Sequence, residues 1–109
     1  MAFDEHLAER IRGQIGRRKA VTEKKLFGGI AFLINGNMAV GIHSKEMIVR
    51  LAPEKTDAAL AKPQTRRFDL TGRPMKGWIL VKPAGLKTDA ALGKWIRVGL
   101  DFASSLSRK

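Results

Sequence analysis

The first hydrophobic pattern along the chain has the period of an amphipathic helix. Over residues 3–17 the apolar positions recur at helical spacing, and charged positions fall between them. The apolar residues of this stretch are Phe3, Leu7, Ala8, Ile11 and Ile15. Gly16 follows the last of them, and glycine is the residue that most often ends a helix. We therefore expect a helix that stops at Gly16.

From residue 21 to residue 51 the period changes to the two-residue alternation of β-strands. Asn35-Gly36 separates two apolar runs and suits the positive φ angles of a two-residue type I′ turn. Residues 43–46 supply the next turn. The apolar or β-branched runs themselves are 21–23, 30–34, 38–42 and 47–51. This segment predicts a four-stranded antiparallel meander.

The region after the meander predicts a short helix and two more strands. Pro53 fits the first turn of a helix that ends before Pro63. Residues 67–70 alternate like a strand, and residues 77–81 form a second apolar run. The intervening residues 71–74 have the composition of a turn.

A last helix follows, and it completes an α+β pattern. Thr88 or Asp89 can cap it. One face of this helix carries Leu92, Trp95, Ile96, Gly99, Ala103 and Leu106. The element order predicts an antiparallel sheet, with a four-stranded meander plus two later strands, flanked by N-terminal, middle and C-terminal helices. A chain of 109 residues accommodates this as one domain, residues 1–109.

The charge balance favours a polyanionic partner. The chain has 21 Lys and Arg against 10 Asp and Glu, a formal net charge of +11. Such a field attracts nucleic acid, an acidic membrane or an acidic protein, and it also serves solubility. The denser basic groups form a candidate site for nucleic acid or an acidic partner: Arg17, Arg18, Lys19, Lys24, Lys25, Arg66, Arg67, Arg73 and Lys76.

No motif in the sequence requires catalysis, a cofactor or a metal ion. The absence of cysteine excludes a disulfide, a thiolate nucleophile and a cysteine zinc site. His6 and His43 lie far apart in the sequence, and neither belongs to a nucleophile elbow. The glycine spacings of phosphate loops and dinucleotide folds are also absent. We predict a protein that is not an enzyme and that has no cofactor and no metal.

Residues 25–32 match part of the octamer with which RNA-recognition motifs bind bases. Gly29 stands where that octamer has the aromatic ring on which a base stacks, and the surrounding order of elements also differs. We therefore interpret Gly28-Gly29 as a tight bend or bulge. Trp78 and Trp95 could stack on bases, but a strand and an apolar helix face more often place such rings in a core.

Several motifs together resemble the N-terminal domain of the TfoX/Sxy family. They are Thr22-Glu23-Lys24-Lys25-Leu26-Phe27-Gly28-Gly29-Ile30-Ala31-Phe32, then Asn35-Gly36-Asn37-Met38, the acidic start Asp4-Glu5-His6-Leu7, the segment Phe68-x-x-Thr71-Gly72-Arg73-Pro74-Met75-x-Gly77, and a closing helix that contains Trp95. The resemblance covers nearly the whole chain. It implies a compact α+β domain with a secretion-chaperone-like architecture.

The same resemblance implies a regulatory role. Full-length members carry a second, helical C-terminal domain and are thought to act with a cyclic-AMP receptor protein at promoters. This chain ends at Lys109, so we expect a stand-alone N-terminal domain. The family often has cysteines where Ala39 and Val40 stand, so the resemblance implies no redox role here. It transfers no catalytic residue.

We expect a cytoplasmic regulatory or adaptor domain that binds a protein partner, with transcription machinery as the candidate. The N-terminus lacks a signal-peptide pattern, and no stretch reaches the length of a membrane span. The alternative is sequence-indifferent binding of nucleic acid through the basic residues. A third hypothesis is an unrecognised enzyme that joins His43 to an acid and a hydroxyl. A homodimer is a further prediction if Ile48, Val49 and Leu51 lie on an edge strand.

Overall fold

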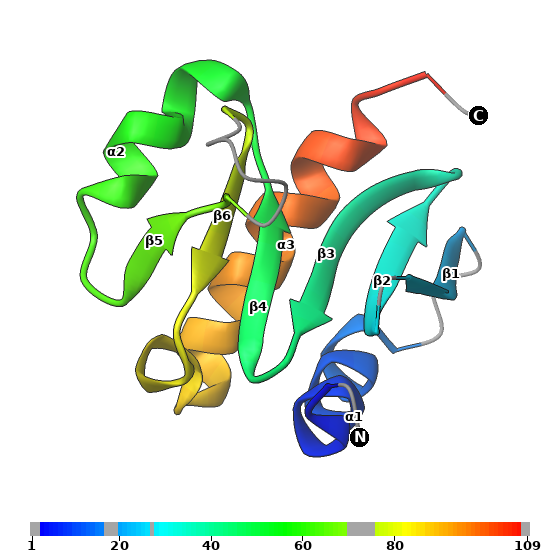
Figure 1. Cartoon of the computed structure of the whole chain (residues 1–109). Coiled ribbons are helices and arrows are strands. Elements are labelled where there is room, and N and C mark those ends of the chain that lie inside the picture. The colour runs from blue at the N-terminus through cyan, green and yellow to red at the C-terminus, as the bar shows by residue number, and fades with distance from the viewer. Residues whose placement is uncertain (1–2, 17–19, 27, 70–75, 108–109) are drawn as a thin grey trace.

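The computed structural model describes residues 3–16, 20–26, 28–69 and 76–107 (Figure 1). Its elements are α1 (Glu5–Ile15), β1 (Val21–Leu26), β2 (Gly29–Ile34), β3 (Asn37–His43), β4 (Glu46–Arg50), the 3-10 turn η1 (Pro53–Lys55), α2 (Thr56–Leu60), β5 (Thr65–Arg67), β6 (Trp78–Val81), the 3-10 turn η2 (Pro83–Leu86) and α3 (Asp89–Ser104). The strands form a six-stranded antiparallel sheet in the order β1-β2-β3-β4-β6-β5. The predicted α+β class is confirmed, with helices at the N-terminus, in the middle and at the C-terminus.

Helix α1 begins and ends where its sequence provides caps. The Asp4 carboxylate accepts a hydrogen bond of 3.1 Å from the backbone N–H of Leu7, which satisfies an otherwise unpaired donor of the first turn. At the other end Gly16 has a φ of 68°, and its N–H donates to the carbonyl of Arg12. The predicted stop at Gly16 is confirmed. The helix buries Leu7, Ala8, Ile11 and Ile15.

The meander is confirmed, and its turns contain the residues that positive φ angles require. Asn35 and Gly36 have φ angles of 54° and 82°, as a type I′ turn demands at both positions. Gly28, with a φ of 77°, lies between β1 and β2, so the interpretation of Gly28-Gly29 as a tight bend is confirmed. The register between β2 and β3 shifts after Phe32, which leaves Ala39 as an extra residue on β3.

The later strands differ from the prediction in bounds and in order. β6 lies between β4 and β5, so β4 is an interior strand and the prediction of an edge strand through Ile48, Val49 and Leu51 is wrong. The edges of the sheet are β1 and β5. β5 covers Thr65–Arg67 instead of residues 67–70. Leu70 and the predicted turn at 71–74 lie outside the described residues. Local alternation predicts a strand but does not specify its neighbours.

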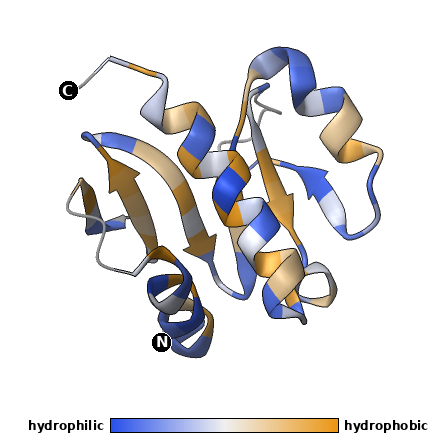
Figure 2. Ribbon diagram, turned by 180° about the vertical axis from the view of Figure 1, so that it is seen from behind, coloured by the Kyte–Doolittle hydropathy of each residue, from blue (hydrophilic) through white to orange (hydrophobic). Residues whose placement is uncertain are grey.

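One face of the sheet packs against α3 and α1 and forms the core (Figure 2). Thr88 caps α3 by accepting a hydrogen bond from the N–H of Ala91. The expected apolar face is confirmed except at Leu106, which lies beyond the end of the helix. Trp95 packs against the core as expected. The sheet contributes Ile30, Phe32, Val40, Ile42, Met47, Val49, Ile79 and Val81 to this core.

The opposite side of the sheet, which we call the outer face, is formed by the alternate residues of the same strands. The cross-strand register joins one row over all six strands: Lys24, Ala31, Gly41, Ile48, Leu80 and Arg66. A second row beside it contains Thr22, Leu33, Met38, Arg50, Trp78 and, just after β5, Phe68. Because side chains alternate along a strand, these residues lie on the side opposite α3. The guanidinium of Arg50 nevertheless also reaches the ring of Phe102 in α3, at 5.6 Å.

Candidate binding surfaces

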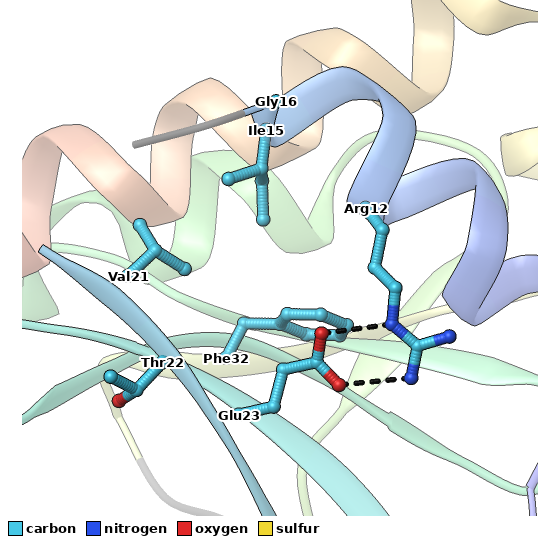
Figure 3. A pocket seen from close by; sticks show the side chains of 7 residues that line it. All are labelled: Arg12, Ile15, Gly16, Val21, Thr22, Glu23 and Phe32. Carbon is cyan, nitrogen blue, oxygen red and sulfur yellow. Dashed lines mark hydrogen bonds and ion pairs between the residues drawn. The ribbon is translucent and has the colours of Figure 1, made fainter. Parts of the chain in front are cut away.

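A groove of about 550 Å³ separates the second half of α1 from β1 (Figure 3). Its apolar lining includes Ile15 and Phe32, which are buried in the core. Its polar lining consists mainly of Arg12 and Glu23, which face each other from the helix and the strand. Gly16, Val21 and Thr22 complete it. The groove therefore combines an apolar floor with an ion pair.

The ion pair in this groove is bidentate and holds both groups in their charged forms. The Nε and Nη2 atoms of Arg12 donate to the two carboxylate oxygens of Glu23 at 2.8 and 2.9 Å. These hydrogen bonds lower the pKa of Glu23 and raise the pKa of Arg12, against the opposing effect of desolvation. Glu9 also accepts a hydrogen bond from Arg12. A carboxylate with a lowered pKa has no proton to donate at neutral pH and is also a weaker base than an ordinary glutamate, so this ion pair is not tuned for acid–base catalysis.

A second bidentate ion pair lies on the outer face. Arg66 of β5 donates from Nε and Nη2 to the carboxylate of Glu46 on β4, at 2.7 and 2.6 Å. The pair spans β6 and lies beside Leu80, which is fully buried. The hydrogen bonds from Arg66 lower the pKa of Glu46 most, and the charges of His43 and Lys82 lower it further. Asp69 is the second acidic partner of Arg66, at 3.5 Å.

The described members of the basic candidate site fall into two groups at opposite edges of the sheet. Lys24 and Lys25 are exposed on β1, at one edge. Arg66 and Arg67 lie on β5, at the other edge, and Lys76 precedes β6. Five strand spacings separate the edges, about 24 Å. The remaining members Arg17, Arg18, Lys19 and Arg73 lie outside the described residues.

Neighbouring basic residues also point to different sides. Lys24 pairs with Ala31 on the outer face, whereas Lys25 pairs with Ile30 on the helix side. Neither lysine has an acidic partner in the part of the chain that the structure describes. Arg66 already has two acidic partners, so it is less available to an external anion than its position in the sequence suggested.

The outer face carries an aromatic cluster that the sequence interpretation missed. Trp78 is half-buried there, and its ring lies 5.8 Å from that of Phe68, so the assignment of Trp78 to the core is wrong. The guanidinium of Arg50 lies 5.0 Å from the Trp78 ring and 5.6 Å from that of Phe102. Alternation could not have revealed this placement, because residues 78–81 are apolar throughout and Leu80, on the same face as Trp78, is as buried as Ile79.

The third hypothesis, catalysis that involves His43, gains no geometric support. His43 ends β3, pairs with Glu46 and does not line the groove of Figure 3. Glu46 is already bonded to Arg66. Among the residues that the structure describes, no three His, Asp or Glu side chains come together in a way that could hold a metal ion. In the same part of the chain, no helix is both long and apolar enough to cross a bilayer.

One known family model matches most of this chain. The family model described as the TfoX N-terminal domain matches residues 13–103, from within α1 to within α3. The chain belongs to this family. The match includes the whole sheet, so the TfoX N-terminal domain accounts for almost all of the described fold, and the chain is a competence-regulator-like domain. Comparisons with curated proteins and with solved structures found no match.

Proposed function

We propose that the chain is a non-enzymatic regulatory or adaptor domain that binds a protein partner linked to transcription. Family membership carries this proposal, because the TfoX N-terminal domain model matches residues 13–103 and competence regulators act on gene expression. The cytoplasm, where transcription takes place in bacteria, is the compartment that the proposal requires. Binding without chemistry also agrees with Glu23 and Glu46, since each carboxylate is held in a bidentate ion pair instead of being poised for proton transfer.

The proposal is tested by affinity capture from an extract of the source cells. The full chain is immobilised, the extract is treated with nuclease, and bound proteins are identified by mass spectrometry. We expect a partner with a role in transcription that is retained after nuclease treatment and is absent from an unrelated bait of similar positive charge. Recovery of only those proteins that disappear with the nucleic acid would contradict the proposal.

Direct binding of nucleic acid is the second candidate, because the net charge is +11 and Lys24 and Lys25 have no acidic partner among the described residues. Each phosphate neutralised on duplex DNA contributes about 0.9 to the slope of log affinity against log salt. A single edge that uses these two lysines predicts a shallow slope of about −2. A titration with duplex DNA over a salt series distinguishes the candidates. Binding at low salt with a slope near −2 would support nucleic-acid binding through these two lysines, and a slope near −5 would require more of the basic residues at the interface. No binding at low salt would exclude nucleic acid.

A further inference from the structure

We infer that the outer face of the sheet is the surface that binds the partner, and that the partner presents an acidic segment carrying apolar side chains. This inference rests on the proposed function and adds the face and the chemistry of the partner. Of the described helices, α3 packs against the other face of the sheet. Helix α2 lies beside β5 and β6. No described helix covers the outer face (Figure 1). Its first row is nevertheless buried at Ala31, Ile48 and Leu80, so the partly exposed second row is the part that a partner can reach.

The apolar part of this surface consists of two pairs of partly exposed side chains, Leu33 with Met38 and Phe68 with Trp78, and Arg50 lies between the pairs. Leu33 pairs across the strands with Met38, and Arg50 donates to the carbonyl of Met38 at 3.4 Å. Trp78 is the cross-strand neighbour of Arg50 and contacts Phe68. Each of these apolar side chains is half-buried, although no described helix lies over it. A row of this kind offers an anchoring site for apolar side chains of a partner.

The charged groups around that row indicate the charge that a partner should carry. The carboxylates on this side, Glu46 and the nearby Asp69, are both bonded to Arg66. Lys24 and Arg50 have no carboxylate partner among the described residues, and Lys82 lies near enough to Glu46 to lower its pKa. The uncompensated charge is positive, so an acidic segment is complementary to the face. A second copy of the chain is not, because both copies would present the same cations on molecules of net charge +11.

The aromatic cluster favours a protein over single-stranded nucleic acid. Bases stack on free faces of aromatic rings, and the Trp78 ring already carries the guanidinium of Arg50, 5.0 Å from its centroid. The tilt of 38° between the rings of Phe68 and Trp78 also differs from a flat stacking platform. Apolar side chains need no parallel ring face, and they can pack along the edges of Leu33, Met38 and Trp78.

The test uses the full chain with its methionine methyl groups labelled with carbon-13 and observed by NMR. Met38 reports on the outer face, whereas Met47 is fully buried on the helix side and reports on the core. Three probes of matched length are titrated: a synthetic peptide in which Glu alternates with Leu and Phe, polyglutamate, and oligothymidylate. We expect the peptide to bind more tightly than either other probe and to shift the Met38 methyl signal but not the Met47 signal.

Lys24→Glu and Lys25→Glu form a matched pair of variants. They make the same change in net charge at adjacent exposed positions, but the register places the side chains on opposite faces. We expect K24E to raise the Kd of the Glu/Leu/Phe peptide about tenfold, and K25E to raise it less than about threefold. Leu33→Glu should raise the Kd of the same peptide more than K24E does. An unchanged Met47 signal shows that each variant is folded.

Several results would overturn the inference. They are equal weakening by K24E and K25E, an unshifted Met38 signal with all three probes, and tighter binding of oligothymidylate than of the Glu/Leu/Phe peptide. The last result would assign the face to nucleic acid. A nuclease-resistant partner that binds K24E and L33E baits as well as the wild type would refute this face while leaving the proposed function intact. If no such partner exists, the proposed function fails whatever the NMR titration shows.

Discussion

Replacement of Gly99 by alanine tests how closely α3 packs on the sheet. A Cβ at this position would lie 2.5 Å from the carbonyl oxygen of Ala39 and 2.6 Å from Cγ1 of Val40. Close carbon–oxygen contacts in proteins are about 3.3 Å. Helix and strand would therefore have to separate by about 0.8 Å, the difference between about 3.3 Å and 2.5 Å. That separation would loosen the packing of the buried neighbours Ile96 and Leu100.

The expected magnitude combines two opposing terms. Overpacking of a core costs about 1–3 kcal/mol, and the upper part of this range applies because a backbone carbonyl cannot rotate away. Alanine in a helix interior regains about 1 kcal/mol relative to glycine. We expect G99A to lower the free energy of unfolding by about 1–2 kcal/mol. For a domain of this size the Tm should fall by about 4–8 °C for each kcal/mol. Urea unfolding followed by far-UV circular dichroism measures the first quantity, and a thermal scan measures the second.

Gly13→Ala in α1 is the matched control. It makes the same substitution in a helix, but a Cβ at Gly13 would have no neighbour within 4 Å. Only the helix propensity term remains, so G13A should raise the free energy of unfolding by up to about 1 kcal/mol. The two variants are expected to shift stability in opposite directions. If G99A were as stable as the wild type, or more stable like G13A, the proposed clash between a Cβ at residue 99 and β3 would be incorrect.

Three further substitutions test other contacts. The folded pKa of Glu46 lies below its ordinary value of 4.5, so its ion pair with Arg66 stabilises the fold above about pH 4.5 and is lost as the pH falls below that value. Because the Arg66 side chain is 39% exposed, solvent limits this contribution to about 1 kcal/mol. E46Q should lose correspondingly less stability than the wild type between neutral pH and about pH 3 in urea unfolding; equal losses would contradict the assignment. Thr88→Ala removes the cap bond to Ala91 and should cost about 1 kcal/mol, whereas Thr88→Ser should restore most of it in the same assay. Gly36→Ala, at a φ of 82°, should lower stability by about 1 kcal/mol, and a neutral result would argue against the type I′ turn.

The features that the sequence predicted well are those governed by neighbouring residues. Asn35-Gly36 specified its turn because both positions need positive φ angles, and the structure has both. Gly16 ended α1 for a related reason, since it adopts a left-handed φ that other residues rarely adopt. Thr88 was one of two candidate caps for α3, and its hydroxyl makes the capping bond. Each of these depends on a few consecutive residues.

The features that the sequence did not predict depend on residues brought together by the order of strands. β6 pairs with both β4 and β5, and this arrangement places Arg66 across from Glu46. The local sequence near residue 66 shows only Asp69, the more distant of its two acidic partners at 3.5 Å, and gives no sign of the bidentate pair with Glu46. The same order makes β4 an interior strand and moves the sheet edge to β5. Charge counting treats every arginine as available, whereas the fold decides which ones have acidic partners.

Lys24 and Lys25 show what a count of net charge cannot distinguish. They are identical, adjacent and exposed, and any count of net charge treats them alike. The pairing of Lys24 with Ala31 and of Lys25 with Ile30 nevertheless separates them by the thickness of a sheet. A partner that approaches the outer face meets Lys24 beside the apolar row that begins at Leu33, while Lys25 faces the side occupied by α1 and α3. Binding by net charge alone predicts equal effects of the two substitutions, and binding by a face predicts unequal ones. The period of two along one edge strand is thus enough to separate a general attraction for anions from a defined docking surface.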